Sequence, residues 1–190
     1  MRIVGIIGSP RHGRNTAALV QEVLRGATSV GAETEAFYVN DLNLRPCQGC
    51  EACKGSGVCA HGDDMHILYD ALTAAGGLVW GSPIYIDHVS AQTKMVLDRL
   101  YAFLGEGLES RFPKGVKSVT CLTWEAPNPN AYDDVADWLE ARLQYYLEIE
   151  TVARLTAGRT NLTPVQQRPE LLKAAFDAGV RLVEAAQAGQ

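Results

Sequence analysis

Four of the five cysteines lie close together in the sequence, between residues 47 and 59. They are Cys47, Cys50, Cys53 and Cys59, with two, two and five residues between successive thiols. Thiolates at such short intervals are suited to wrapping around a cuboidal iron-sulfur cluster, whereas structural zinc usually takes two ligand pairs with a longer spacer. The spacing therefore favours a cluster over zinc; free thiols, disulfides or a purely structural loop remain as alternatives. Cys121 lies in an apolar run and is expected in the core.

A polar loop from Gly8 to Thr16 joins an apolar run to an amphipathic stretch. Where a strand leads into a helix, free backbone N–H groups and the positive end of the helix dipole converge and favour a phosphate. Ser9, Asn15 and Thr16 can donate to a phosphate, Arg11 or Arg14 can neutralise its charge, and Gly13 allows close approach of the backbone. The sequence has neither the Lys-Ser/Thr pair of a P-loop nor the three-glycine dinucleotide fingerprint, which argues against an NTPase. The alternative is a polar turn with a helix cap.

A second loop follows the apolar run from Gly77 to Trp80 and contains Ser82, Pro83, Ile84, Tyr85 and Ile86. Its backbone N–H groups and apolar side chains offer hydrogen bonds and a hydrophobic wall to a flat ring, and the proline restrains the backbone. Thr123 and Trp124 open a third loop, rich in Pro and Asn. Taken alone, the second loop is equally consistent with a turn around a buried tyrosine, so its pairing with the first loop is what favours a ring site.

The elements that must position these loops alternate along the chain. Short β-branched runs alternate with longer amphipathic stretches, which is typical of βα units and predicts one three-layer α/β domain over residues 1–190. Five parallel strands of a doubly wound sheet are expected at Arg2 to Ile7, Thr34 to Val39, Gly77 to Ser82, Val116 to Thr123 and Glu150 to Ala157. Helices are expected from Asn15-Thr16 as cap, after Asp63-Asp64 to Leu72, from Val89 to Phe103, around Val135 to Tyr146, and from Pro169. The interruption is a cysteine- and glycine-rich loop at residues 40–62, and the alternation alone leaves the strand order open.

The charge balance limits the classes of partner that the protein is expected to bind. The chain has 190 residues with 17 basic and 22 acidic side chains, a net charge of −5. Without a broad cationic face, neither nucleic acid nor an anionic membrane is an expected partner. The first apolar run is too short for a signal peptide, and no later run approaches the roughly 20 apolar residues of a membrane span. A soluble, cytoplasmic protein is expected.

In combination, three segments resemble the flavodoxin-like NAD(P)H-dependent FMN reductase superfamily and, within it, the iron-sulfur flavoproteins. They are Gly8-Ser9-Pro10-Arg11 with Asn15-Thr16, the cysteine segment followed by Asp63-Asp64-Met65, and Gly81-Ser82-Pro83-Ile84-Tyr85 leading into Ser90-Ala91-Gln92-x-Lys94 and Asp98-Arg99. The resemblance implies strand order 2-1-3-4-5 and noncovalent FMN, with its phosphate at Ser9, Arg11, Asn15 and Thr16. It places the isoalloxazine ring against Pro83 to Ile86, with Thr123 and Trp124 along the pyrimidine side. One departure is Arg14, which stands where the family often has glycine, with Gly13 before it.

The resemblance implies an oxidoreductase that passes electrons from NAD(P)H through FMN to a protein or small-molecule acceptor. A [4Fe-4S] cluster held by the four cysteines would then convert two-electron into one-electron transfer. The family also implies a homodimer or homotetramer. Because the chemistry resides in the cofactor, no catalytic side chain is assigned. The alternatives are a flavin or quinone reductase without a cluster, and a non-enzymatic cysteine-based redox or metal sensor. A response regulator is excluded because Ile7-Gly8-Ser9 offers no acidic residue.

Overall fold

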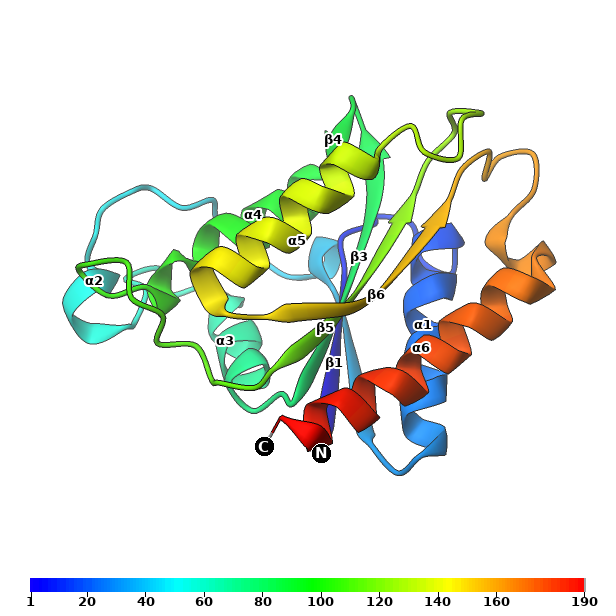
Figure 1. The fold of residues 1–190 in the computed structure, drawn as a ribbon. Helices are drawn as coiled ribbons and strands as arrows, with labels where there is room; N and C mark the ends of the chain where they lie inside the picture. The colour runs from blue at the N-terminus through cyan, green and yellow to red at the C-terminus, as the bar shows by residue number, and fades with distance from the viewer. Residues whose placement is uncertain (190) are drawn as a thin grey trace.

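The computed structural model describes residues 1–189 and shows a parallel sheet covered by helices on both faces (Figure 1). The main strands are β1 (Arg2–Ile7), β2 (Glu33–Tyr38), β3 (Gly77–Tyr85), β5 (Lys117–Thr123) and β6 (Glu150–Ala157). Their order in the sheet is β2-β1-β3-β5-β6, and all four neighbouring pairs are parallel. The doubly wound, three-layer architecture and the implied 2-1-3-4-5 order are thus confirmed. A short strand, β4 (His88–Val89), pairs antiparallel with the end of β3 and was not predicted.

Two apolar clusters pack against opposite faces of the sheet. On one face lie α1 (Asn15–Ser29) and α6 (Pro169–Ala188); on the other lie α3 (Met65–Thr73), α4 (Ala91–Arg99) and α5 (Asp133–Leu147) (Figure 1). Strand β1 contributes side chains to both clusters. Ile3 and Ile7 pack with α1 and α6, while Val4 and Ile6 pack with the helices on the opposite face. All four side chains are fully buried, as expected for an inner strand of a doubly covered sheet.

The remaining elements of the described residues are three 3-10 turns and one short helix. The 3-10 turns are η1 (Val39–Asp41), η2 (Leu100–Phe103) and η3 (Val165–Gln167), and the short helix is α2 (Cys53–Ser56). The segment expected to be a continuous loop at residues 40–62 therefore contains α2 and the end of η1. The helix expected from Val89 to Phe103 begins at Ala91, because Val89 belongs to β4 and the Ser90 side chain caps α4 by accepting from the N–H of Thr93. It ends at Arg99 and is followed by the 3-10 turn η2.

Two further expectations are corrected at the carboxyl edge of the sheet. Strand β3 continues past Ser82 to Tyr85, so the segment expected to be a loop is the first arm of the β3–β4 hairpin. Asn15 and Thr16 do not cap α1: the N-cap position is Arg14, and no side chain caps it. Asn15 instead accepts a hydrogen bond of 2.9 Å from the backbone N–H of Val165 through its Oδ1.

Helices α1 and α6 approach closely through glycines. A Cβ atom at Gly26 would lie 2.0 Å from the carbonyl oxygen of Phe176, and one at Gly179 would lie 1.9 Å from that of Val23. The carboxyl end of the chain is therefore fixed against the helix that follows the first loop. Within residues 1–189, no helix is both long and apolar enough to cross a bilayer.

Candidate functional site

The carboxyl ends of the parallel strands surround a cavity of about 490 Å³. It lies at the upper edge of the sheet in Figure 1, where the loops after β1, β5 and β6 meet the β3–β4 hairpin. Nine of the twelve residues predicted to contact a cofactor line it: Ser9, Arg11, Asn15, Thr16, Pro83, Ile84, Tyr85, Thr123 and Trp124. Three segments far apart in the sequence are thus brought together at the edge where doubly wound sheets bind ligands.

Buried hydroxyl groups line part of the cavity. The hydroxyl groups of Thr16 and Thr123 lie 2.7 Å apart, which ties the first turn of α1 to the end of β5. Both threonines are buried, as is Ser9, whose Oγ accepts from the backbone N–H of Arg11 at 3.2 Å. The Thr16–Thr123 contact thus joins the loop after β1 to β5, which lies two places along the sheet.

The first loop presents positive charge to the cavity. Arg11 and Arg14 are exposed and line it. Since no side chain caps α1, its first N–H groups remain available to an anion, and the positive end of its dipole points the same way. Gly13 adopts φ +62°, the left-handed region that favours glycine. It lies outside the cavity wall, and its carbonyl accepts from the Gln166 side chain at 2.9 Å.

The β3–β4 hairpin forms another wall. Ile84 pairs with Val89 and Tyr85 pairs with His88, and the turn between them is Ile86-Asp87. Both turn residues have positive φ, +47° and +58°. Ile86 is 98% exposed at the tip and does not line the cavity.

Ser82 also lies outside the wall. It is buried, and its hydroxyl accepts from the N–H of Ser90 at 3.0 Å, so in this structure it braces the hairpin against the start of α4.

The loop after β6 adds a wall that the sequence analysis missed. Its lining residues are Thr160, Asn161, Pro164 and Gln166. The other lining residues outside the predicted contacts are Arg14 in the first loop and Glu125, Ala126 and Tyr132 between β5 and α5. Glu125 holds this loop by accepting from the Thr160 hydroxyl at 2.5 Å and from the Asn161 N–H at 2.9 Å. The signal for it was available, because a loop that follows the fifth parallel strand must emerge at the same edge as the others.

The cysteine loop, defined as residues 40–62, lies well away from β4, at the left of Figure 1 around α2. All its cysteines are free; Cys47 and Cys50 are exposed, Cys53 is buried and Cys59 is half-buried. Burial raises the pKa of the Cys53 thiol, and negative charge on the other three cysteines raises it further. Among residues 1–189, however, no three metal-ligating side chains converge as a preformed metal site.

A buried ion pair closes the base of the cysteine loop. Arg99 is 2% exposed, and its Nη1 and Nη2 donate to the two carboxylate oxygens of Asp63 at 2.8 and 3.0 Å. Asp63 in turn accepts from the backbone N–H groups of Arg45 and Met65 at 2.8 and 3.2 Å. Burial alone would raise the pKa of Asp63, but these hydrogen bonds and the Arg99 charge outweigh it and lower the pKa to about 2.

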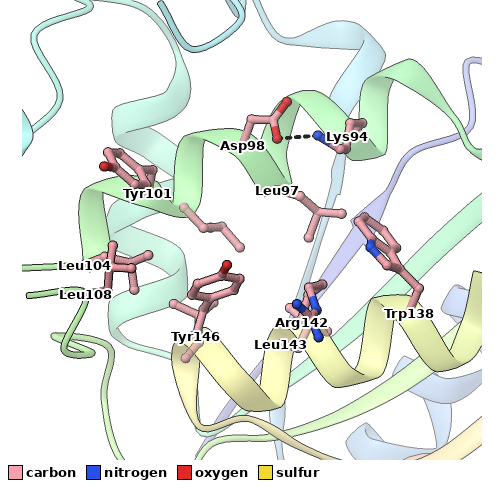
Figure 2. A pocket seen from close by; sticks show the side chains of 12 residues that line it. Lys94, Leu97, Asp98, Tyr101, Leu104, Leu108, Trp138, Arg142, Leu143 and Tyr146 are labelled. Carbon is pink, nitrogen blue, oxygen red and sulfur yellow. Dashed lines mark hydrogen bonds and ion pairs between the residues drawn. The ribbon is translucent and has the colours of Figure 1, made fainter. Parts of the chain in front are cut away.

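A second, more apolar cavity of about 440 Å³ lies between α4 with η2 and α5. Figure 2 shows Leu97, Tyr101, Trp138 and Tyr146 around it, with the Lys94–Asp98 ion pair at its rim. The Trp138 ring packs edge-on against His88 of the hairpin, with ring centres 4.6 Å apart. None of the predicted cofactor contacts line this cavity, so it is separate from the site at the sheet edge.

A sequence profile of the family described as NADPH-dependent FMN reductase matches residues 1–114. An iron-sulfur flavoprotein of Methanocaldococcus jannaschii is 43% identical over 99 residues, 52% of this chain and 51% of that protein. One of Methanosarcina thermophila is 35% identical over 99 residues, 52% of this chain and 52% of that protein. The chain therefore spans about half the length of the curated relatives it matches.

Solved structures agree with the fold over the whole chain. An NAD(P)H:quinone oxidoreductase from Methanothermobacter marburgensis superimposes with a TM-score of 0.77 at 16% identity, covering 96% of this chain and 98% of that one. A flavone reductase gives a TM-score of 0.75 at 18% identity, covering 100% of this chain and 65% of the other. The profile match contains the first loop, the cysteine loop and the β3–β4 hairpin. The curated relatives that match about half of their own length are named iron-sulfur flavoproteins. By the profile match over residues 1–114, the chain belongs to the NADPH-dependent FMN reductase family, whose flavodoxin-like fold it has.

Proposed function

We propose that this chain binds FMN noncovalently in the cavity at the carboxyl edge of the sheet and acts as an FMN-dependent oxidoreductase. The observation that supports this is the convergence of the first loop, the hairpin and the loop after β5 on one cavity of about 490 Å³. That volume lies within the roughly 300–1,000 Å³ typical of small-ligand sites. The residues fit a flavin nucleotide, since the cationic side chains of the first loop line the cavity and Pro83, Ile84 and Trp124 supply apolar surface.

Each wall has a defined task in this proposal. Arg11, Ser9 and the uncapped N–H groups of α1 bind the phosphate, with Arg14 as a second cation at the rim. Tyr85 and the neighbouring hairpin backbone orient the ring, and Thr123 with Trp124 bounds its far side. Glu125 keeps the loop after β6 closed over the cavity, which excludes water. FMN, when bound, supplies the redox chemistry, and the protein supplies position and electrostatics.

We further propose that NAD(P)H is the reductant and that Cys47, Cys50, Cys53 and Cys59 hold a [4Fe-4S] cluster. Four thiols at this spacing are a suitable donor set, and two buried nitrogens at the base of the loop, on His61 and Arg99, have no hydrogen-bond partner. A cluster, when bound, supplies one-electron steps toward a protein or small-molecule acceptor. Because Cys47 and Cys50 are exposed, their part of the loop has room to close around it. We also expect a cytoplasmic homodimer or homotetramer.

A flavin or quinone reductase without a cluster is the second candidate. It is favoured by one observation: the thiols within residues 1–189 are not gathered into a ready metal site. In this case the cysteine loop keeps free thiols and electrons leave from FMN directly to a small acceptor.

Anaerobic purification followed by iron and sulfide reconstitution tests both candidates. The proposal predicts one FMN and four iron atoms per chain, broad visible absorption beyond that of flavin, and oxidation of NADH or NADPH with an artificial acceptor. Stoichiometric FMN without iron supports the second candidate. Tight metal binding without FMN or NAD(P)H oxidation contradicts both and supports a sensor.

A further inference from the structure

The 3-10 turn η3 contacts the first loop from far along the chain. The backbone N–H of Val165 donates to Asn15 Oδ1 at 2.9 Å, and the Gln166 side chain donates through Nε2 to the carbonyl oxygen of Gly13, also at 2.9 Å. Gly13 and Asn15 flank Arg14, the N-cap of α1. Two hydrogen bonds from η3 therefore hold the residues on either side of the position where α1 begins.

The contact with Val165 determines how the Asn15 amide can be used. A backbone N–H can only donate, so it must face the amide oxygen of Asn15 and not the amide nitrogen. The Oδ1 atom is thereby occupied, and the Nδ2 group keeps its two N–H donors. Because Asn15 lines the cavity, these donors can serve an anion bound there, next to the uncapped N–H groups of α1.

Further contacts fix η3 in place. Val165 is fully buried in the apolar cluster that it shares with α1 and α6. Arg168, directly after the turn, donates through Nη2 to the carbonyl oxygens of Gly158 and Thr163 at 2.5 and 2.6 Å, and through Nε to that of Thr163 at 2.9 Å. Helix α6 begins at the next residue, Pro169. The two donors that reach the first loop are therefore held by the loop before the turn and by the helix after it.

We propose that Val165 and Gln166 are positioning residues for the flavin phosphate: they hold the first loop in its phosphate-binding form before FMN binds, and so make the site select FMN over riboflavin. This rests on the proposed FMN site. Donors that are already in place bind an anion more tightly, because ordering them on binding costs free energy. The family profile matches only residues 1–114, so this part of the site comes from the half of the chain outside the match.

Affinities for FMN and for riboflavin, which lacks the phosphate, separate this role from a general contribution to folding. The ratio of the riboflavin Kd to the FMN Kd measures what the phosphate contributes, and quenching of flavin fluorescence gives both constants. Hydrogen exchange of the flavin-free protein, followed in the peptide that contains the first loop, reports how firmly that loop is held. Thermal unfolding of each variant reports its general stability.

Val165→Pro removes the backbone donor to Asn15. Proline is well tolerated at the first position of a helical turn, and Pro164 already has ψ 150°, the extended conformation that a residue before proline prefers. The matched control is Val165→Ala, which keeps the N–H but shortens the buried side chain.

Gln166→Met removes the side-chain donor to Gly13 and keeps the length of the side chain. Its matched control is Gln167→Met, at the exposed neighbouring residue of the same turn.

We expect the Kd ratio to fall about threefold to tenfold in Val165→Pro and in Gln166→Met, as for the loss of one hydrogen bond. Riboflavin affinity should change by less than about twofold, because riboflavin has no phosphate for these donors to serve. The first loop should exchange faster than in the wild type in both variants. Both controls should keep the wild-type ratio, even where Val165→Ala lowers the thermal stability.

A wild-type ratio in Val165→Pro and Gln166→Met overturns the positioning role, as does an equal fall in Val165→Ala. First-loop exchange at the wild-type rate in both donor-removing variants overturns the claim that η3 holds the loop. Wild-type protein that binds neither flavin, or binds both with the same Kd, contradicts the proposed FMN site instead. The wild type alone therefore distinguishes the two failures.

Discussion

Two arginines decide the charge of the cofactor cavity. Arg11 and Arg14 both line it, and the one acidic lining residue, Glu125, is occupied by Thr160 and Asn161. The cavity is thus prepared for an anion in a chain whose net charge is −5. At the scale of single residues, this local excess of positive charge is the feature that favours a phosphorylated ligand over a neutral ring.

Arg11→Ala should weaken FMN binding by roughly 10- to 100-fold, because a charge-assisted hydrogen bond contributes about 1.5–3 kcal/mol. Fluorescence quenching of FMN on titration with apoprotein measures it. The matched control is Arg142→Ala, which removes an arginine from the apolar cavity on α5 and should leave FMN affinity within about twofold. Equal losses in the two variants would count against the phosphate site.

The free energy of unfolding should depend on pH through the ionisation of Asp63. Its folded pKa of about 2 lies below the usual 3.8, so the ionised form stabilises the fold by about 2 kcal/mol above pH 5, and roughly half of this is lost by pH 3. Urea unfolding at pH 6 and pH 3 measures the difference. Asp63→Asn should lower stability at pH 6 and reduce the pH dependence by about 1 kcal/mol. An unchanged pH dependence in that variant would contradict the assignment.

Residue types and spacing were sufficient to find most of the cavity wall. The donors of the first loop were predictable because a strand-to-helix junction fixes where N–H groups point. The orientation of individual side chains was not predictable. Ser82 contacts Ser90, and Ile86 is exposed to solvent at the hairpin tip. The role of Glu125 was not predictable either, because its partners, Thr160 and Asn161, lie in another loop, the one after β6.

At the scale of elements, the length of β3 was the main error. Proline usually interrupts a strand, so the prediction ended β3 at Ser82. In the structure Pro83 pairs with Thr123, the last residue of β5. The missing N–H of proline therefore falls where the parallel ladder ends, and the strand continues as one arm of the hairpin.

The hairpin turn carries backbone strain that can be relieved. Ile86 holds φ +47°, which is unfavourable for a β-branched residue by roughly 1 kcal/mol or more. Ile86→Asn should raise stability by about 1 kcal/mol, because asparagine tolerates this region and favours such turns. Thermal unfolding measures it. Val30→Asn, at an exposed valine with negative φ, is the control and should not raise thermal stability. A rise in both variants would contradict the claim that Ile86 is strained.

The close contact between α1 and α6 helps to position the first loop, because α1 begins directly after that loop. Gly179→Ala would place a methyl group 1.9 Å from the Val23 carbonyl oxygen and 2.8 Å from the Ala27 nitrogen. Because these are backbone atoms, the helices must separate. We expect the free energy of unfolding to fall by about 1–3 kcal/mol, as measured by urea unfolding. We also expect weaker FMN binding.

Gly62→Ala, which meets no atom within 4 Å, is the control and should change neither quantity. Wild-type stability in Gly179→Ala would contradict the packing described for α1 and α6.

At the scale of the whole molecule, the sequence predicted the architecture well. The alternation of buried strands with amphipathic helices required a doubly covered sheet, and the resemblance of the first half supplied its order. The second half completes the same sheet although the family profile matches only residues 1–114. The volumes of the cavities could not be predicted, because they depend on how helices from both halves of the chain pack. The apolar cavity between α4 and α5 is the clearest case.

The central claim is that the carboxyl edge of the sheet holds FMN, and crystals grown with FMN test it most directly. The account predicts density for the phosphate among Ser9, Arg11 and the first turn of α1, with the ring between the hairpin and Trp124. Density for FMN in the α4–α5 cavity instead, or a sheet edge filled by the protein's own side chains at saturating FMN, would contradict it.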